Sequence, residues 1–295
     1  MPYYTYNFSG ILDSYLGYYL FMIPGILAVL IASIAVKSTF RRYSSVANSR
    51  GMTGADAALA VLRAYGVTDV TVERVSGNLT DNYDPRRKVI HLSESVYDSR
   101  SVAAVGVAAH EAGHAAQYAA GYAPVKLRMA MIPVCNIGAQ LALPLLILGS
   151  VFNFFGLMVA GLALFALSVF FQLVTLPVEF NASRRALAVI REHDLLVGEE
   201  YTGAKKTLTA AAMTYVAALF QEVLSLLWFL FRVAWRCRCY GHRPRRRAQG
   251  PRRRRGGQVF QPRARRRPAP RRPLTGGCRA RHRPLLRRAR PQDHP

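Results

Sequence analysis

The segment His110-Glu111-Ala112-Gly113-His114 carries the clearest chemical signal in the sequence. On a helix, side chains four positions apart share a face, so two imidazoles at this spacing can bind one ion. Glu111 lies beside them, where it can take a proton from a zinc-bound water and later deliver it to a leaving amine. The spacing therefore predicts a zinc site with His110 and His114 as ligands and Glu111 as general base. A helix with ordinary interior histidines is the alternative.

A third zinc ligand is expected downstream, because catalytic zinc usually has three protein ligands and one open position. Glu179 is the best candidate, since it stands at the end of a long apolar segment and precedes a polar one. A boundary carboxylate that simply meets water is the alternative. Glu192, Glu199 and Glu200 lie further along the same polar segment.

Peptide hydrolysis also requires a donor that stabilises the oxyanion formed on attack. Arg185, His193 and Tyr201 follow Glu179 and carry cationic or phenolic groups. No spacing rule separates these three candidates, and each is more often a solvated residue of a polar helix than a catalytic group.

Residues 43–126 have the pattern of a small soluble domain around the zinc motif. Thr53 begins an amphipathic helix, residues 70–75 and 88–93 are rich in β-formers, and Ser101 begins the helix that carries the two histidines. Helix, strands and an HExxH helix follow one another as in a zincin core. We therefore expect a zincin-like α/β domain here.

The strand at residues 88–93 lies directly before the zinc helix. Zincins commonly present an edge strand at this place, which pairs with an extended peptide and holds the scissile bond over the metal. We expect such an edge strand here, with an ordinary sheet edge as the alternative.

The first apolar run, residues 15–36, contains no charge and is followed by Lys37, Arg41 and Arg42. Its length suits one membrane crossing, and the basic residues after it place its carboxyl end in the cytoplasm and residues 1–14 outside. A cleaved signal peptide is the alternative, but its basic residues should precede the apolar stretch.

A second apolar region, residues 129–178, has no charged side chain and is interrupted near residues 150–156. It is too long for one crossing and suits a transmembrane hairpin whose ends are both cytoplasmic. Residues 179–209 then read as a polar helical segment that carries the third ligand.

The last apolar run, residues 210–235, contains Gln221, Glu222 and Arg232. It is a weaker candidate, either transmembrane or interfacial. The predicted fold class is therefore α+β: a mainly helical multi-pass membrane protein with a small zincin-like core.

The net charge of +24 comes mainly from residues 236–295, which hold 22 Arg and one Asp. This Arg/Pro-rich tail has no hydrophobic period, so we expect disorder. If the tail is functional, it could tether the protein to nucleic acid or anionic lipid. The alternative is that this stretch is an out-of-frame translation. The rest of the chain is nearly balanced in charge, so no nucleic-acid partner is expected of the folded part.

The four cysteines do not form a spaced framework. Cys135 lies in an apolar run, and Cys237, Cys239 and Cys278 lie in the tail. Neither a disulfide scaffold nor a cysteine-type zinc site is predicted.

Three segments, residues 82–93, 108–115 and 179–186, together resemble the bacterial neutral zinc metallopeptidases of the YugP type, over about residues 8–230. The arrangement is more distantly similar to the membrane gluzincins that include HtpX and the CAAX prenyl endopeptidases, in which a Glu-x-x-Ala-Asp segment completes the site. The resemblance implies that Glu179 is the third ligand. This chain has Ser183 where the distant relatives have Asp, which changes the polar support of a ligand histidine.

These observations predict a membrane-bound zinc metallopeptidase that hydrolyses peptide bonds, as an endopeptidase, with its active site facing the cytoplasm. Its cofactor is Zn²⁺, and its partners are a protein or peptide substrate and the lipid bilayer. The alternatives are a zinc hydrolase of another amide or ester, an inactive zinc-binding membrane scaffold and the basic-tailed tether. An intact Glu111 argues against the scaffold, because a binding-only zinc site does not require a base.

Overall fold

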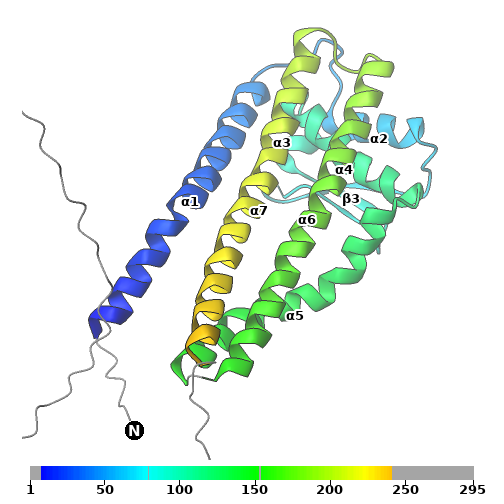
Figure 1. The fold of residues 1–295 in the computed structure, drawn as a ribbon. Coiled ribbons are helices and arrows are strands. Elements are labelled where there is room, and N and C mark those ends of the chain that lie inside the picture. The colour runs from blue at the N-terminus through cyan, green and yellow to red at the C-terminus, as the bar shows by residue number, and fades with distance from the viewer. Residues whose placement is uncertain (1–7, 79, 153, 241–295) are drawn as a thin grey trace, which may run out of the picture. The chain divides into compact units, whose positions relative to one another are not determined.

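The structure is a computed structural model that describes residues 8–78, 80–152 and 154–240 (Figure 1). The predicted N-terminal segment and the Arg-rich tail lie largely outside these residues. The elements follow in the order α1 (Phe8–Ser44), α2 (Gly54–Ala64), β1 (Thr71–Val75), β2 (Asn82–Asp84), β3 (Val89–Ser93), α3 (Glu94–Tyr97), α4 (Val102–Ala119), α5 (Ala123–Val151), α6 (Phe155–Glu192) and α7 (Glu199–Tyr240). The fold is α+β and mainly helical, as predicted.

Four of these helices, α1, α5, α6 and α7, are long and apolar enough to cross a membrane. Helix α1 contains the predicted span at residues 15–36, and α5 and α6 form the hairpin predicted at residues 129–178. The break in that hairpin falls where α5 ends at Val151 and α6 begins at Phe155. Helix α7 is also apolar enough over Glu199–Ala234, which favours the transmembrane reading of residues 210–235 over the interfacial one.

Helices α1 and α7 run antiparallel along each other. A Cβ added at Gly25 of α1 would collide with the Gln221 side chain of α7, and a Cβ added at Gly203 of α7 would collide with the Tyr43 ring of α1. The first half of α1 therefore packs on the second half of α7, and the end of α1 packs on the beginning of α7. The two glycines permit this close approach along most of the apolar length.

Helices α6 and α7 also pack side by side in opposite directions. Gln172 Nε2 of α6 donates a hydrogen bond to Glu222 Oε1 of α7 at 3.2 Å. Near their polar ends the same two helices meet again through Leu187 and Leu208. Helix α7 therefore packs against both α1 and helix α6 of the hairpin.

Helix α6 continues well beyond the apolar segment. Ala182, Ala186, Val189 and Ile190 keep a buried apolar face at helical spacing, so the helix does not restart at Glu179 but extends to Glu192. The chain then reverses at residues 193–198. The polar segment predicted at residues 179–209 is therefore divided between the end of α6 and the beginning of α7.

The small sheet has the order β1-β3-β2. Strand β3 pairs with β1 in parallel and with β2 in antiparallel orientation, so both of its edges are hydrogen-bonded. The expectation that residues 88–93 form an edge strand is therefore wrong. The reason is local, because the turn-rich segment before them itself contributes a short strand, β2, which covers that edge.

Thr53 and Ser101, the two residues predicted to begin helices, both form helix-capping interactions. Thr53 and Asp56 form a reciprocal capping box at the beginning of α2. Ser101 Oγ accepts a hydrogen bond from the Ala104 N–H at 3.2 Å at the beginning of α4. Helix α4, rich in Ala and Gly, then packs against α2, α6 and α7, which makes it the centre of the domain.

Candidate metal centre

Helices α4 and α6 bring three potential metal ligands together. His110 and His114 project from α4, and their Nε2 atoms lie 3.4 and 3.5 Å from Oε2 of Glu179 on α6. One ligand atom from each of the three residues lies within 4.8 Å of the others. The structure therefore assembles the three residues that the sequence singled out.

The donor set and its spacing fit a zinc ion. Zinc is bound by imidazole nitrogen and carboxylate oxygen at about 2.0–2.1 Å, and two ligands of a tetrahedral ion are then about 3.3–3.4 Å apart. The separations of Glu179 Oε2 from the two histidine nitrogens, 3.4 and 3.5 Å, agree with that geometry. Two imidazoles and one carboxylate are also the ligand set of a catalytic site that keeps a fourth position open.

The His114 ring is oriented by a buried amide. Gln117 Nε2 donates to the Val178 carbonyl at 2.7 Å and to Asn181 Oδ1 at 3.0 Å, so its Oε1 remains as the acceptor. This Oε1 lies 3.1 Å from His114 Nδ1. Nδ1 therefore carries the proton and donates, which leaves the Nε2 lone pair for a metal.

The His110 ring is oriented by the residue that departs from the distant relatives. Ser183 Oγ of α6 lies 3.1 Å from His110 Nδ1, so the residue that is Asp in the distant relatives is here a hydroxyl partner of His110. A hydroxyl accepts a hydrogen bond from Nδ1–H as a carboxylate does, but it adds no negative charge to the site. Ser183 thus supplies the orientation of His110 while leaving Glu179 as the buried anion of the cluster.

Glu179 has a second partner that the sequence did not reveal. Arg128 Nη1, from the beginning of α5, lies 3.2 Å from Glu179 Oε1, and the Glu179 side chain is only 4% exposed. A carboxylate buried to this degree requires charge compensation. Arg128 is the last charged residue before the hairpin in the sequence. A basic residue at that position also indicates membrane topology, so the sequence alone does not identify it as a partner of Glu179.

Glycine at position 113 sets the distance between the two ligand-bearing helices. A Cβ at Gly113 would lie 2.5 Å from the Ala182 carbonyl oxygen of α6, too close for any side chain. At Gly106, on the same helix, the nearest contact of an added Cβ would be 3.4 Å, to Ala204 of α7. The glycine within the HExxH segment therefore lets α6 approach closely enough for Glu179 to reach both histidines.

Glu111 is partly exposed beside the ligand cluster. Within the described part of the chain its carboxylate forms no hydrogen bond or ion pair, so it is available to exchange a proton. Burial lowers the pKa of the His114 imidazole, but the Glu179 and Glu111 carboxylates outweigh that effect and leave this pKa raised. Glu111 thus contributes to the electrostatic field at the ligands.

The three oxyanion candidates are not gathered at the metal ligands. Arg185 Nε donates to Asn181 Oδ1 at 2.9 Å, and its guanidinium lies over the Tyr65 ring. His193 caps the end of α6, about 21 Å along the helix from Glu179. Tyr201 packs on the hydrophobic core near the beginning of α7.

A phenol that the sequence did not single out lies closer to the site. Tyr215 of α7 is partly buried, and its hydroxyl interacts with the Glu179 carboxylate. Its sequence position, within an apolar run, is also typical of an ordinary membrane-belt tyrosine. The antiparallel pairing of α6 and α7 is what brings it to Glu179, and a single sequence does not specify that register.

The four helices of spanning length and the cluster of two histidines and a glutamate define a membrane protein with a site suited to zinc. The sequence profile described as "Putative neutral zinc metallopeptidase" matches residues 18–234. The chain is also 47% identical over 203 residues to "Putative membrane protease YugP" of Bacillus subtilis (strain 168), a match covering 68% of this chain and 88% of the relative. No solved structure matches the chain.

The profile match spans well over half of the sequence, and the chain belongs to this family of neutral zinc metallopeptidases. The relative is named as a membrane protease, and the four apolar helices agree with a location in the membrane. The resemblance read from the three sequence segments is confirmed.

Proposed function

We propose that the protein is a zinc-dependent membrane endopeptidase in which His110, His114 and Glu179 hold the metal and Glu111 is the general base. The observation that carries this proposal is the meeting of His110 Nε2, His114 Nε2 and Glu179 Oε2 at the separations expected around one tetrahedral ion. Both imidazoles have their Nδ1 atoms engaged by Ser183 and Gln117, so both present Nε2 to the same point.

Zinc bound there would lower the pKa of a coordinated water toward neutrality and polarise the peptide carbonyl. Glu111 accepts the proton of the attacking water and returns it to the leaving amine. The Tyr215 hydroxyl, beside Glu179, is the donor we assign to the oxyanion in place of Arg185, His193 and Tyr201. Arg128 holds Glu179 in place through its second oxygen.

An extended substrate would pair with β2 rather than β3. Strand β3 is hydrogen-bonded on both edges, whereas β1 and β2 are the two edge strands of the sheet. The Tyr83 ring of β2 contacts the Tyr118 ring of α4, with centroids 5.4 Å apart, so β2 lies beside the HExxH helix. Backbone pairing at this edge would hold a peptide with little sequence preference.

We place the active site on the cytoplasmic side. The basic residues Lys37, Arg41 and Arg42 follow the apolar part of α1, and Lys126 and Arg128 precede that of α5. The close contact of Tyr43 with Gly203 puts the end of α1 and the beginning of α7 at the same level, so the basic residues after the apolar part of α1 and Lys205 and Lys206 of α7 lie on the same side.

The substitution Glu111→Gln tests the mechanism. The amide keeps the volume but cannot act as a base at neutral pH, so hydrolysis of an unfolded protein substrate should be abolished while zinc stays near one per chain. Glu192→Gln is the matched control, because Glu192 is an exposed glutamate at the end of α6 and should change neither quantity. Full activity in Glu111→Gln would reject the mechanism, and loss of zinc would mean that Glu111 has a different role.

A further inference from the structure

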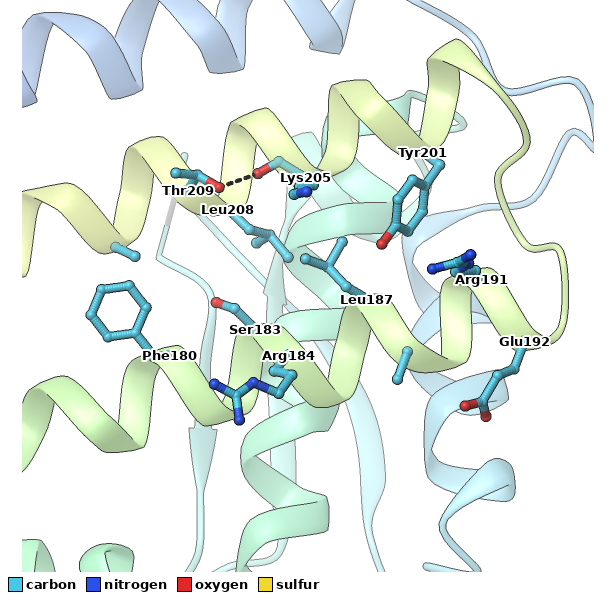
Figure 2. A pocket seen from close by; sticks show the side chains of 12 residues that line it. Phe180, Ser183, Arg184, Leu187, Arg191, Glu192, Tyr201, Lys205, Leu208 and Thr209 are labelled. Carbon is cyan, nitrogen blue, oxygen red and sulfur yellow. Dashed lines mark hydrogen bonds between the residues drawn. The ribbon is translucent and has the colours of Figure 1, made fainter.

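A groove of about 740 Å³ runs between the polar halves of α6 and α7 (Figure 2). Both walls are helices that continue into the apolar segments of the protein. Figure 2 shows Leu187 of α6 and Leu208 of α7 approaching each other between the two helices, with Lys205 and Tyr201 above them on α7. The groove is therefore open to whatever surrounds the spanning helices where they leave the membrane.

One end of this groove is apolar. Phe180 of α6 and Leu208 and Ala212 of α7 line it, and Phe180 is 42% exposed. Because α6 and α7 are antiparallel, this end points toward the Gln172–Glu222 contact in the apolar part of both helices. An exposed phenylalanine there suits contact with hydrocarbon.

The other end of the groove is cationic. Arg191 and Lys205 line it and are exposed. Arg184, also exposed, lines the groove one helical turn from Phe180, and Glu192 is the one acidic residue of the whole lining. None of the three cations forms an ion pair with any acidic group in residues 16–234 that the structure describes. The groove thus has an excess of unpaired positive charge at the end away from the membrane interior.

A second cationic pocket of about 690 Å³ lies on the opposite flank of Lys205, between α1 and α7. Arg42 and Lys206 line it together with Lys205 and several hydroxyl groups, and its lining contains no acidic residue. Positive charge is therefore concentrated around the beginning of α7, where basic groups from three helices meet.

The groove is distinct from the place where a peptide bond would be cut. None of His110, Glu111, His114 and Glu179 lines it. Its link with the metal centre is Ser183, which lines the groove and hydrogen-bonds to His110 Nδ1. The groove therefore adjoins the metal centre at Ser183, but its lining does not include the proposed ligands or the general base.

We propose that this groove binds an anionic phospholipid. The headgroup phosphate contacts Arg191 and Lys205, and an acyl chain lies along Phe180, Leu208 and Ala212. A polarity gradient from hydrocarbon to cation along one groove matches the gradient of a phospholipid at the membrane surface, and basic pockets between spanning helices are suited to anionic headgroups. The bound lipid would contact the wall that contains Ser183. The proposal requires the membrane location but not the peptidase mechanism.

Native mass spectrometry of the full-length protein, delipidated in detergent, tests this proposal. Phosphatidylglycerol and phosphatidylcholine with identical acyl chains are titrated separately. We expect wild type to retain phosphatidylglycerol preferentially. Arg191→Gln/Lys205→Gln should weaken its binding roughly 30-fold, because each basic group near a membrane surface contributes about 1 kcal/mol. Arg86→Gln/Arg87→Gln, which removes the same charge from the exposed turn before β3, should leave the preference unchanged.

A second variant tests the apolar part of the groove. Ala188→Trp fills the groove from α6 without changing its charge and should reduce the binding of both lipids. Circular dichroism and a monodisperse elution profile confirm that each variant is folded. Equal binding of the two lipids by wild type, or unchanged phosphatidylglycerol binding by either groove variant, would overturn the proposal. Displacement of the lipid by millimolar inorganic phosphate or by an acidic peptide would instead assign the cations to a soluble ligand.

Discussion

Arg128 and Glu179 form an ion pair in which Arg128 Nη1 lies 3.2 Å from Glu179 Oε1. The other oxygen of this carboxylate, Oε2, is the one that faces both histidines. The two oxygens thus have different partners: Oε1 pairs with a guanidinium, and Oε2 faces the point where the proposed zinc would lie. A carboxylate fixed in this way loses little freedom when an ion binds.

Arg128→Gln should therefore weaken zinc binding, by about 10- to 100-fold, the range typical of partners that orient a ligand. Competition with a chromophoric chelator measures this affinity. Lys126→Gln is the matched control, because it removes the same charge from an exposed position two residues away on α5 that forms no ion pair with Glu179. Equal losses in the two variants would show that the effect is general electrostatics and not the ion pair.

Glu179→Ala should lose metal as well as activity, because two imidazoles alone hold zinc weakly. Alanine substitutions at Glu192, Glu199 and Glu200 should retain zinc, since these residues lie at the far end of α6 and the beginning of α7. Zinc content after dialysis compares all four variants. Full zinc in Glu179→Ala with loss in one of the others would reject the ligand assignment.

Gly113→Ala should destabilise the protein by about 1–3 kcal/mol, because the added methyl group meets the Ala182 carbonyl and forces α4 and α6 apart. Gly106→Ala gains the same helix propensity but makes only a marginal contact, so it should be close to neutral. Thermal unfolding and zinc affinity of both variants check the prediction. A Gly113→Ala protein as stable as Gly106→Ala would mean that the two helices can separate without cost.

Reporter fusions should place residues 43–123 and the turn at residues 193–198 on the cytoplasmic side. Both segments must share one side, because α4 and α6 contribute ligands to the same cluster. Alkaline phosphatase activity from a fusion in either segment would reverse the orientation.

Deletion of residues 241–295 should leave membrane insertion and zinc content unchanged. All three ligand residues and their partners Ser183, Gln117 and Arg128 precede this tail. Membrane fractionation and metal analysis of the shortened chain test this directly. A loss of zinc would show that the tail supports the site.

The local signals in the sequence predicted their structures correctly. The HExxH spacing placed two imidazoles on one face of α4, and Thr53 and Ser101 begin the helices that they were expected to cap. The uncharged stretch at residues 129–178 became a helical hairpin with its break at the predicted place. Each of these features depends on residues close together in the chain, which is why one sequence is sufficient to predict them.

The non-local features were not predictable in the same way. Gln117 contacts Val178 and Asn181, and Arg128 contacts Glu179, across the whole hairpin, so their roles depend on how α4, α5 and α6 pack. The position of β3 in the middle of the sheet depends on a three-residue strand inside a segment dominated by turn formers. Nothing in the local pattern of that segment distinguishes a short strand from a turn.

The histidines and the glutamate of the cluster are separated in the chain by the apolar residues 129–178, with both histidines on α4 and Glu179 on α6. A nascent polypeptide that ends before Glu179 has the HExxH helix but no third ligand. The cluster therefore requires that α6 pack against α4 after the apolar residues 129–178 have been synthesised. If the three residues bind zinc as proposed, a chain that has not yet been synthesised as far as Glu179 lacks the complete ligand set.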